Sequence, residues 1–231
     1  TFFARNITPA GVGSWSDGEL YRAITSGVSK DGHPFFPVMP YPRYNRLSTE
    51  DVYSIIAYLR TLPAIENAVE ASDPQFPVNV ILRTVPEPAA PMERPDPADE
   101  LALGAYLTNA AACGECHTRT EKGKKVGEAF AGGFEFMFPN GSVVRSPNIT
   151  PSVDGGLGRW TKEEFVQRFR MYADSTYVNP AVDHARGEMQ TVMPWLMYAG
   201  MTEEDLGAIY TYLRTVAPVA GTIEKWTPAG P

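Results

Sequence analysis

The chain repeats itself, and this internal repeat constrains its fold more than any other feature of the sequence. Four short blocks of the first half return in the same order in the second half. The pairs are residues 6–9 and 148–151, 13–16 and 158–161, 39–41 and 193–195, and 58–61 and 212–215. The offset between the copies grows from 142 to 145 and then to 154 residues, so the second copy carries two insertions. We therefore expect two copies of one fold in tandem.

The second copy contains the sequence Cys113-Gly114-Glu115-Cys116-His117. This Cys-x-x-Cys-His pattern is the attachment signature of c-type haem. Two intervening residues make about one helical turn, which lets both thiols reach the vinyl groups on one edge of the porphyrin. The adjacent imidazole then lies under the iron. We predict covalent haem c on Cys113 and Cys116, with His117 as an iron ligand.

Other uses of these cysteines are less well supported. They are the only two in the chain, which excludes a disulfide framework. A structural zinc site usually takes four protein ligands, and the other histidines, His33 and His184, come with no second cysteine pair. A Cys-x-x-Cys redox pair would accompany a βαβ pattern, and the sequence has none.

The repeat also indicates what the first copy lacks. His117 precedes Asn148 by 31 residues, whereas only five residues stand before Asn6. We therefore expect the first haem-binding motif to lie upstream of Thr1, on a segment that is cleaved, disordered or on another chain. On this interpretation the sequence is part of a dihaem protein, and Thr1 is a processed or truncated N-terminus. A degenerate first copy that never held haem is the alternative, but its retained Met39 argues against that.

Methionine is the expected sixth ligand, because a thioether opposite histidine favours ferrous iron and raises the reduction potential. Met193 is the candidate in the second copy and Met39 in the first, and each is followed by proline and an aromatic residue. The other nearby methionines and His184 have no methionine or histidine at the corresponding position of the first copy. At the offset of 154, Met189, Met197, Met201 and His184 correspond to Phe35, Arg43, Leu47 and Lys30. We expect His184 and His33 to be surface histidines.

Three further residues are candidates for contacts with the haem propionates. Trp15 and Trp160 each begin a short predicted helix, and their indole N–H groups can donate. Arg145 can pair with a carboxylate through its guanidinium. Packing or surface roles remain open for all three.

The helix signals predict an all-α fold. One helix is expected to begin with Asp96 as its cap and Pro97 in its first turn, and to close with the haem motif. Ser48 and Thr202 fit the capping pattern at the start of the last helix of each copy. The 21 prolines and 20 glycines favour long loops between a few short helices.

A glycine predicts how the helices pack. Gly104 would let the first and last helices of the second copy cross closely, with Tyr210 or Tyr212 at the contact. The predicted domains are residues 1–63 as the C-terminal part of the first domain, 64–96 as the connector and 97–231 as the complete second domain.

The net charge and the hydropathy of the chain limit the kinds of partner that we expect. The net charge is −7 and the pI about 5.1, so we expect no nucleic-acid partner and a redox protein with a basic docking surface. No segment approaches the roughly 20 apolar residues that span a bilayer. Any export signal or membrane anchor would lie on a segment outside this chain.

Several longer segments resemble the multihaem class I cytochromes c, in particular the cytochrome subunits of membrane-bound alcohol and gluconate dehydrogenases. These segments are residues 129–134, 146–151, 156–160, 193–195 and 201–210. The resemblance implies two tandem all-α class I domains, the first without its haem-attachment segment, placed in the periplasm or on the outer face of the bacterial cytoplasmic membrane. It also implies ligation by His117, with Met193 and Met39 as distal ligands.

The expected function is electron transfer as a dihaem relay or shuttle, without catalysis. Two alternatives remain. The first is a haem oxidoreductase such as a peroxidase or a thiosulfate-oxidising cytochrome, which generally needs an open or displaceable iron site. The second is a dedicated cytochrome subunit of a membrane dehydrogenase complex, which differs in its partner and not in its chemistry.

Overall fold

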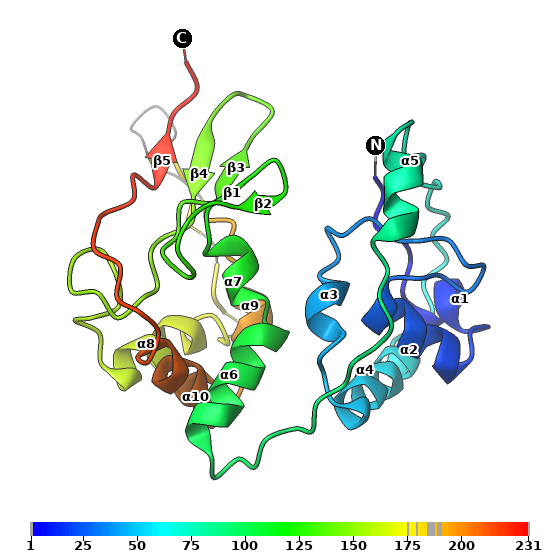
Figure 1. The fold of residues 1–231 in the computed structure, drawn as a ribbon, viewed down its shortest axis with the longest axis horizontal. Coiled ribbons are helices and arrows are strands. Elements are labelled where there is room, and N and C mark those ends of the chain that lie inside the picture. Colours follow the sequence, from blue (N-terminus) through cyan, green and yellow to red (C-terminus); the bar gives the residue numbers. More distant parts are fainter. Residues whose placement is uncertain (1, 175, 179, 184–187, 189–190, 231) are drawn as a thin grey trace. The chain divides into compact units, whose positions relative to one another are not determined.

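Helices make up most of the regular structure, and they fall into two units, Thr1–Arg94 and Pro95–Pro231 (Figure 1). This computed structural model describes the whole chain except residues 1, 175, 179, 184–187, 189–190 and 231.

In the first unit, the two longest helices, α2 (Asp17–Ser26) and α4 (Thr49–Thr61), pack together. They supply most of the buried side chains, which include Leu20, Val52 and Ile56. The helices of this unit are α1 (Pro9–Val12), α2 (Asp17–Ser26), α3 (Tyr41–Tyr44), α4 (Thr49–Thr61), α5 (Val78–Ile81) and the 3₁₀ helix η1 (Leu82–Thr84). The predicted cap of α4 is confirmed, because the Ser48 side chain accepts a hydrogen bond from the Asp51 N–H at 3.0 Å.

The second unit combines helices with short antiparallel strands. Its helices are α6 (Glu100–Ala110), α7 (Cys113–Cys116), α8 (Lys162–Arg170), α9 (Trp195–Tyr198) and α10 (Glu203–Leu213). Its strands are β1 (Thr120–Glu121), β2 (Lys124–Lys125), β3 (Glu135–Met137), β4 (Val143–Arg145) and β5 (Trp226–Thr227). One hydrophobic cluster of its core consists of Leu157, Phe165, Ile209 and Leu213. The predicted cap Thr202 is confirmed by a 3.1 Å hydrogen bond from the Asp205 N–H.

Helices α6 and α10 pack against each other in the lower part of this unit (Figure 1), and a glycine lies at their contact. A Cβ at Gly104 would lie 1.9 Å from the Ala208 carbonyl oxygen and 2.9 Å from the Cβ of Tyr212. Only glycine allows the two backbones to approach so closely. The predicted crossing is therefore confirmed, and Tyr212 is the tyrosine at the contact.

The repeated Asn-Ile-Thr-Pro blocks are held by matching hydrogen bonds in the two units. In the second unit Asn148 Nδ2 donates to the Val219 carbonyl at 2.7 Å, and the Val219 N–H donates to Thr150 Oγ1 at 3.1 Å. In the first unit Asn6 and Thr8 make the same two bonds with Ile65, at 2.8 and 3.2 Å. Ile65 and Val219 are themselves 154 residues apart.

The segment after α10 returns along the second unit. The Gly221 N–H donates to the Asp154 carbonyl at 3.2 Å, and the Arg145 N–H donates to the Lys225 carbonyl at 2.9 Å. Trp226 in β5 then pairs with Val144 in β4. Figure 1 shows β5 beside β4, at the edge of the sheet opposite β3.

Three details differ from the sequence-based expectations. The all-α expectation holds only in part, because β1 with β2 and β3 with β4 form hairpins at turns that contain Gly123 and Gly141. The first helix of the second unit is capped by Asp99 and not by Asp96, which instead caps the preceding turn. The haem motif does not close that helix, because a break at Ala112 separates α7 from α6.

In the part of the chain that the structure describes, no helix has both the length and the hydropathy needed to cross a membrane.

Candidate haem site

The motif cysteines lie at the two ends of a one-turn helix, α7, as the spacing predicted. The His117 N–H closes the turn on the Cys113 carbonyl at 2.9 Å. The preceding residue, Ala112, adopts the left-handed conformation with φ 52° and ψ 30°. Few residues with a side chain adopt it, and it costs roughly 1 kcal/mol or more. It turns the chain sharply out of α6 and gives α7 its own direction.

His117 is buried, with 7% of its surface exposed, and a residue outside the motif fixes the orientation of its ring. Its Nδ1 lies 2.8 Å from the Pro147 carbonyl oxygen, so Nδ1 carries the proton and donates. The other ring nitrogen, Nε2, is then an unprotonated ligand. Burial also lowers the pKa of the imidazole, with the bond to Pro147 acting in the opposite direction, so the neutral form that binds iron prevails at neutral pH.

A glycine allows Pro147 to approach the histidine. Gly132 has φ 79°, and a Cβ there would lie 2.5 Å from the Pro147 carbonyl carbon. The Gly132 N–H also donates to the His117 carbonyl at 2.8 Å. The chain therefore passes between His117 and the Pro147 segment only because residue 132 has no side chain.

The two thiols do not resemble those of a redox or zinc site. Burial raises the pKa of Cys113 to about 12, and burial with the neighbouring Glu115 also raises the pKa of Cys116. As free thiols both would stay protonated, whereas exchange and zinc binding need the thiolate. Among the described residues, no three or more His, Cys, Asp or Glu side chains gather to hold a metal ion.

Met193 lies on the segment that leads into α9. Its side chain is half-buried, its N–H donates to Thr191 Oγ1 at 3.1 Å, and its carbonyl accepts from the Trp195 N–H at 2.8 Å. Of the competing methionines, Met197 is 77% exposed and Met201 packs against the core. Met189 and His184 lie outside the described residues.

Trp195 is enclosed by aromatic and cationic groups. Its ring stacks on Tyr172 with centroids 5.3 Å apart and meets the edge of Phe169 at 5.1 Å. The Arg168 guanidinium lies 4.6 Å from the ring centroid, at cation–π distance. The indole Nε1 is buried and has no hydrogen-bond partner among the described residues.

These residues fit a covalent haem. The motif supplies two thiols and a buried imidazole with one nitrogen free. The orphaned Nε1 of Trp195, two residues after Met193, suits a polar group of a bound ligand, since a buried donor is rarely left unsatisfied.

Of the three residues predicted to contact the haem propionates, Arg145 has other partners and the two tryptophans are partly exposed. Arg145 pairs with Glu135 at 2.8 Å and donates to Thr227 Oγ1 at 2.8 Å. Trp160 is 37% exposed, and Trp15 is half-buried. Their contacts with haem stay predictions.

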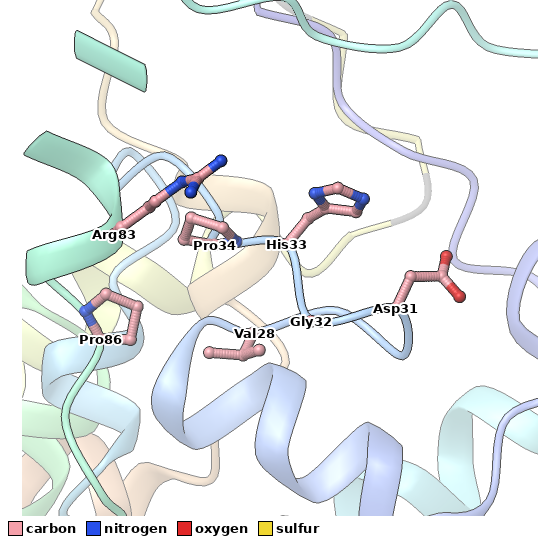
Figure 2. Close-up of a pocket in the computed structure, with 7 residues that line it drawn as sticks. All are labelled: Val28, Asp31, Gly32, His33, Pro34, Arg83 and Pro86. Atoms are coloured by element: carbon pink, nitrogen blue, oxygen red, sulfur yellow. The ribbon is translucent and has the colours of Figure 1, made fainter. Parts of the chain in front are cut away.

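In the first unit, Met39 occupies the position that corresponds to Met193 in the repeat. It is half-buried, and its carbonyl accepts from the Tyr41 N–H at 2.8 Å, as the Met193 carbonyl does from Trp195. A separate surface depression of about 490 Å³ in this unit is lined by Val28, Asp31, Gly32, His33, Pro34, Arg83 and Pro86 (Figure 2). It contains neither Met39 nor Trp15, and His33 is exposed as expected.

Sequence reasoning missed two partners of the site. The first is the Pro147 carbonyl, and the second is Tyr198, whose hydroxyl donates to the Ala111 carbonyl at 2.7 Å. Both bonds end on backbone carbonyl oxygens, which leave no mark on the residue pattern. Only the Gly132-Gly133 pair hinted at a close approach of two chain segments.

Comparison with known proteins agrees with this geometry. The family model described as Cytochrome c matches residues 101–217. The chain is 28% identical to the cytochrome c subunit of alcohol dehydrogenase (quinone) from Gluconacetobacter polyoxogenes, over 98% of this chain and 50% of that protein. It is 32% identical to the fructose dehydrogenase cytochrome subunit of Gluconobacter japonicus, over 93% of this chain and 44% of that protein.

A third relative is shorter. The chain is 30% identical to a diheme cytochrome c-type protein of Cereibacter sphaeroides, over 95% of this chain and 73% of that protein. By contrast, the chain spans about half the length of the alcohol dehydrogenase subunits it matches.

Proposed function

Because the chain belongs to the cytochrome c family, we propose that it transfers electrons through covalently bound haem and catalyses no substrate reaction of its own. The observation that carries the proposal is the buried His117, whose Nδ1 is fixed by the Pro147 carbonyl and whose Nε2 is left to bind iron. A haem group supplies one-electron chemistry when bound. The chain's own part is to hold it, orient it and keep water away.

The residues that would hold the haem come from two segments. Cys113 and Cys116 would form the thioether bonds, and His117 and Met193 would be the axial ligands. Methionine opposite histidine favours the ferrous state. A fixed methionine would also leave no open coordination position, which favours an electron carrier over a peroxidase or a thiosulfate-oxidising enzyme.

The first unit would hold a second haem with Met39 as its distal ligand, in a tandem arrangement of two class I domains. What supports this is an uncovered face on α4. Ile55 is 39% exposed, whereas its counterpart Ile209 on α10 is 4% exposed. Tyr58 is 65% exposed, whereas its counterpart Tyr212 packs against Gly104 of α6. A helix equivalent to α6, carrying a second haem motif, would cover this face.

The relatives suggest the setting. Several are named as cytochrome subunits of alcohol, fructose and gluconate dehydrogenases. We infer that this chain relays electrons to or from such a redox protein outside the cytoplasmic membrane, either as a dedicated subunit or as a separate shuttle. Its net charge of −7 favours a partner with a basic docking surface, and no nucleic-acid partner is proposed.

Replacing Met193 with alanine tests the ligand assignment. We expect the Met193→Ala holoprotein to lose the methionine-to-ferric-iron charge-transfer absorption of this haem and to show a lower reduction potential, because the thioether is gone. Absorption spectroscopy and redox titration measure the two effects.

Met197→Ala is the matched control, since Met197 lies on α9 four residues away and is 77% exposed. It should leave both readouts unchanged. An unchanged absorption band in Met193→Ala would show that another residue binds the iron.

A further inference from the structure

The haem site of the second unit is built from two segments far apart in the sequence, and a hydrogen bond joins them. Tyr198 ends α9, five residues after Met193, and its Oη donates to the Ala111 carbonyl at 2.7 Å. Ala111 lies two residues before Cys113. We propose that Tyr198 is a positioning residue that holds the Met193 segment against the turn leading into the haem motif. The inference rests on the proposed function, in which Met193 is an iron ligand.

At one end, the bond fixes the turn into α7. Ala111 is the C-cap of α6, and carbonyl oxygens at this end of a helix lack helical partners. The peptide group that contains the Ala111 carbonyl leads directly into Ala112, which has φ 52°. A donor on this carbonyl therefore fixes the orientation of the strained residue from which Cys113 and α7 start.

At the other end, the tyrosine is fixed to the methionine segment. The Tyr198 ring meets the edge of Phe169 with centroids 6.3 Å apart, and Phe169 also contacts Trp195 at 5.1 Å. The Trp195 N–H in turn donates to the Met193 carbonyl at 2.8 Å. A continuous set of contacts thus runs from Ala111 to Met193.

The repeat supports the same role. Tyr44 ends α3 as Tyr198 ends α9, 154 residues later, and it lies five residues after Met39. The described residues include no hydrogen-bond partner for the Tyr44 hydroxyl. The tyrosine is thus repeated together with the methionine, at the same distance from it.

Imidazole binding to the ferric holoprotein tests the proposal, because added imidazole must displace the methionine. Removing only the hydroxyl in Tyr198→Phe should loosen the Met193 segment and tighten imidazole binding about tenfold, the effect of losing one partly buried hydrogen bond. The titration follows the haem whose charge-transfer band is lost in Met193→Ala.

Two controls separate positioning from general loosening. Tyr210→Phe breaks a bond of equal length, to the Trp160 carbonyl at 2.7 Å, in the same unit, and should leave imidazole affinity unchanged. In a Met193→Ala background, Tyr198→Phe should also have no effect, since no methionine remains to be held. Equal affinities in Tyr198→Phe and Tyr210→Phe, or a change that persists without Met193, would overturn the proposal.

If Tyr198→Phe loses its haem, a modified tyrosine at the same position still tests the proposal. Site-specific 3-fluorotyrosine at position 198 makes the hydroxyl a stronger donor and should weaken imidazole binding. A change in the other direction, or none, contradicts the proposal. Failure of the ligand assignment itself would be seen separately, as an unchanged band in Met193→Ala alone.

Discussion

At the scale of single residues, Asn148 links the loop beside the haem site to the rest of its unit. It is 4% exposed, and its Oδ1 accepts from both the N–H and the Oγ1 of Thr150 at 2.8 Å. Its Nδ2 donates to the Val219 carbonyl. Because Pro147 is the preceding residue, the same side chain supports the carbonyl that orients His117.

Removing this amide should destabilise the second unit. We expect Asn148→Ala to lower its free energy of unfolding by about 3 kcal/mol, because buried polar partners are left unsatisfied. Urea unfolding followed by circular dichroism measures the change, with the transition of each unit fitted separately.

Asn6→Ala is the matched control in the first unit. Asn6 makes the corresponding bonds but is only half-buried, so water can replace its amide and the loss should be about 1 kcal/mol. Equal losses in the two variants would show that burial does not set the cost.

At the scale of elements, the helix crossing in the second unit depends on Gly104. The ideal Cβ position at this residue lies inside the Ala208 carbonyl, which belongs to the backbone of α10 and cannot rotate away. A larger residue must therefore push the two helices apart, and the motif that follows α6 would move with them.

Gly104→Ala should cost about 3 kcal/mol or more of unfolding free energy, since overpacking a close helix crossing strains the backbone. Thermal or urea unfolding of the holoprotein measures it. Gly18→Ala in α2 is the control, because no atom beyond its chain neighbours and its own helix backbone lies within 4 Å of its Cβ position, and alanine favours the helix. That variant should be neutral or about 0.5 kcal/mol more stable. A similar effect at both sites would contradict the packing argument.

The sequence predicted some elements better than others, for physical reasons. The caps at Ser48 and Thr202 and the glycine crossing were predicted because they depend on residues close in sequence or on glycine itself. The break at Ala112 was not, because the run Ala110-Ala111-Ala112 favours a continuous helix. The partners of Arg145 were missed as well, since Thr227 lies 82 residues away.

At the scale of the whole molecule, the repeat carries the most information. It singled out Met193 and Met39, and the matching hydrogen bonds of Asn6 and Asn148 follow the same offset. What it could not predict is the sheet of the second unit, because none of the four repeated blocks falls within β3, β4 or β5.

Haem content tests the proposal of two haem-binding units. We expect the protein purified from its natural source to carry two covalent haems, one of them attached outside residues 1–231. Intact mass spectrometry and the pyridine haemochrome assay both count them. A single haem per protein would contradict the role proposed for Met39 and for the uncovered face of α4.

The returning segment after α10 has a practical consequence for anyone who trims this protein. The family match ends at residue 217, so a boundary chosen from it would discard Val219 and Trp226. The Asn148 amide would lose its acceptor, and β4 would be left with an open edge prone to intermolecular pairing. Trimming should spare Thr227, and a tag or an electrode linker is better attached beyond it.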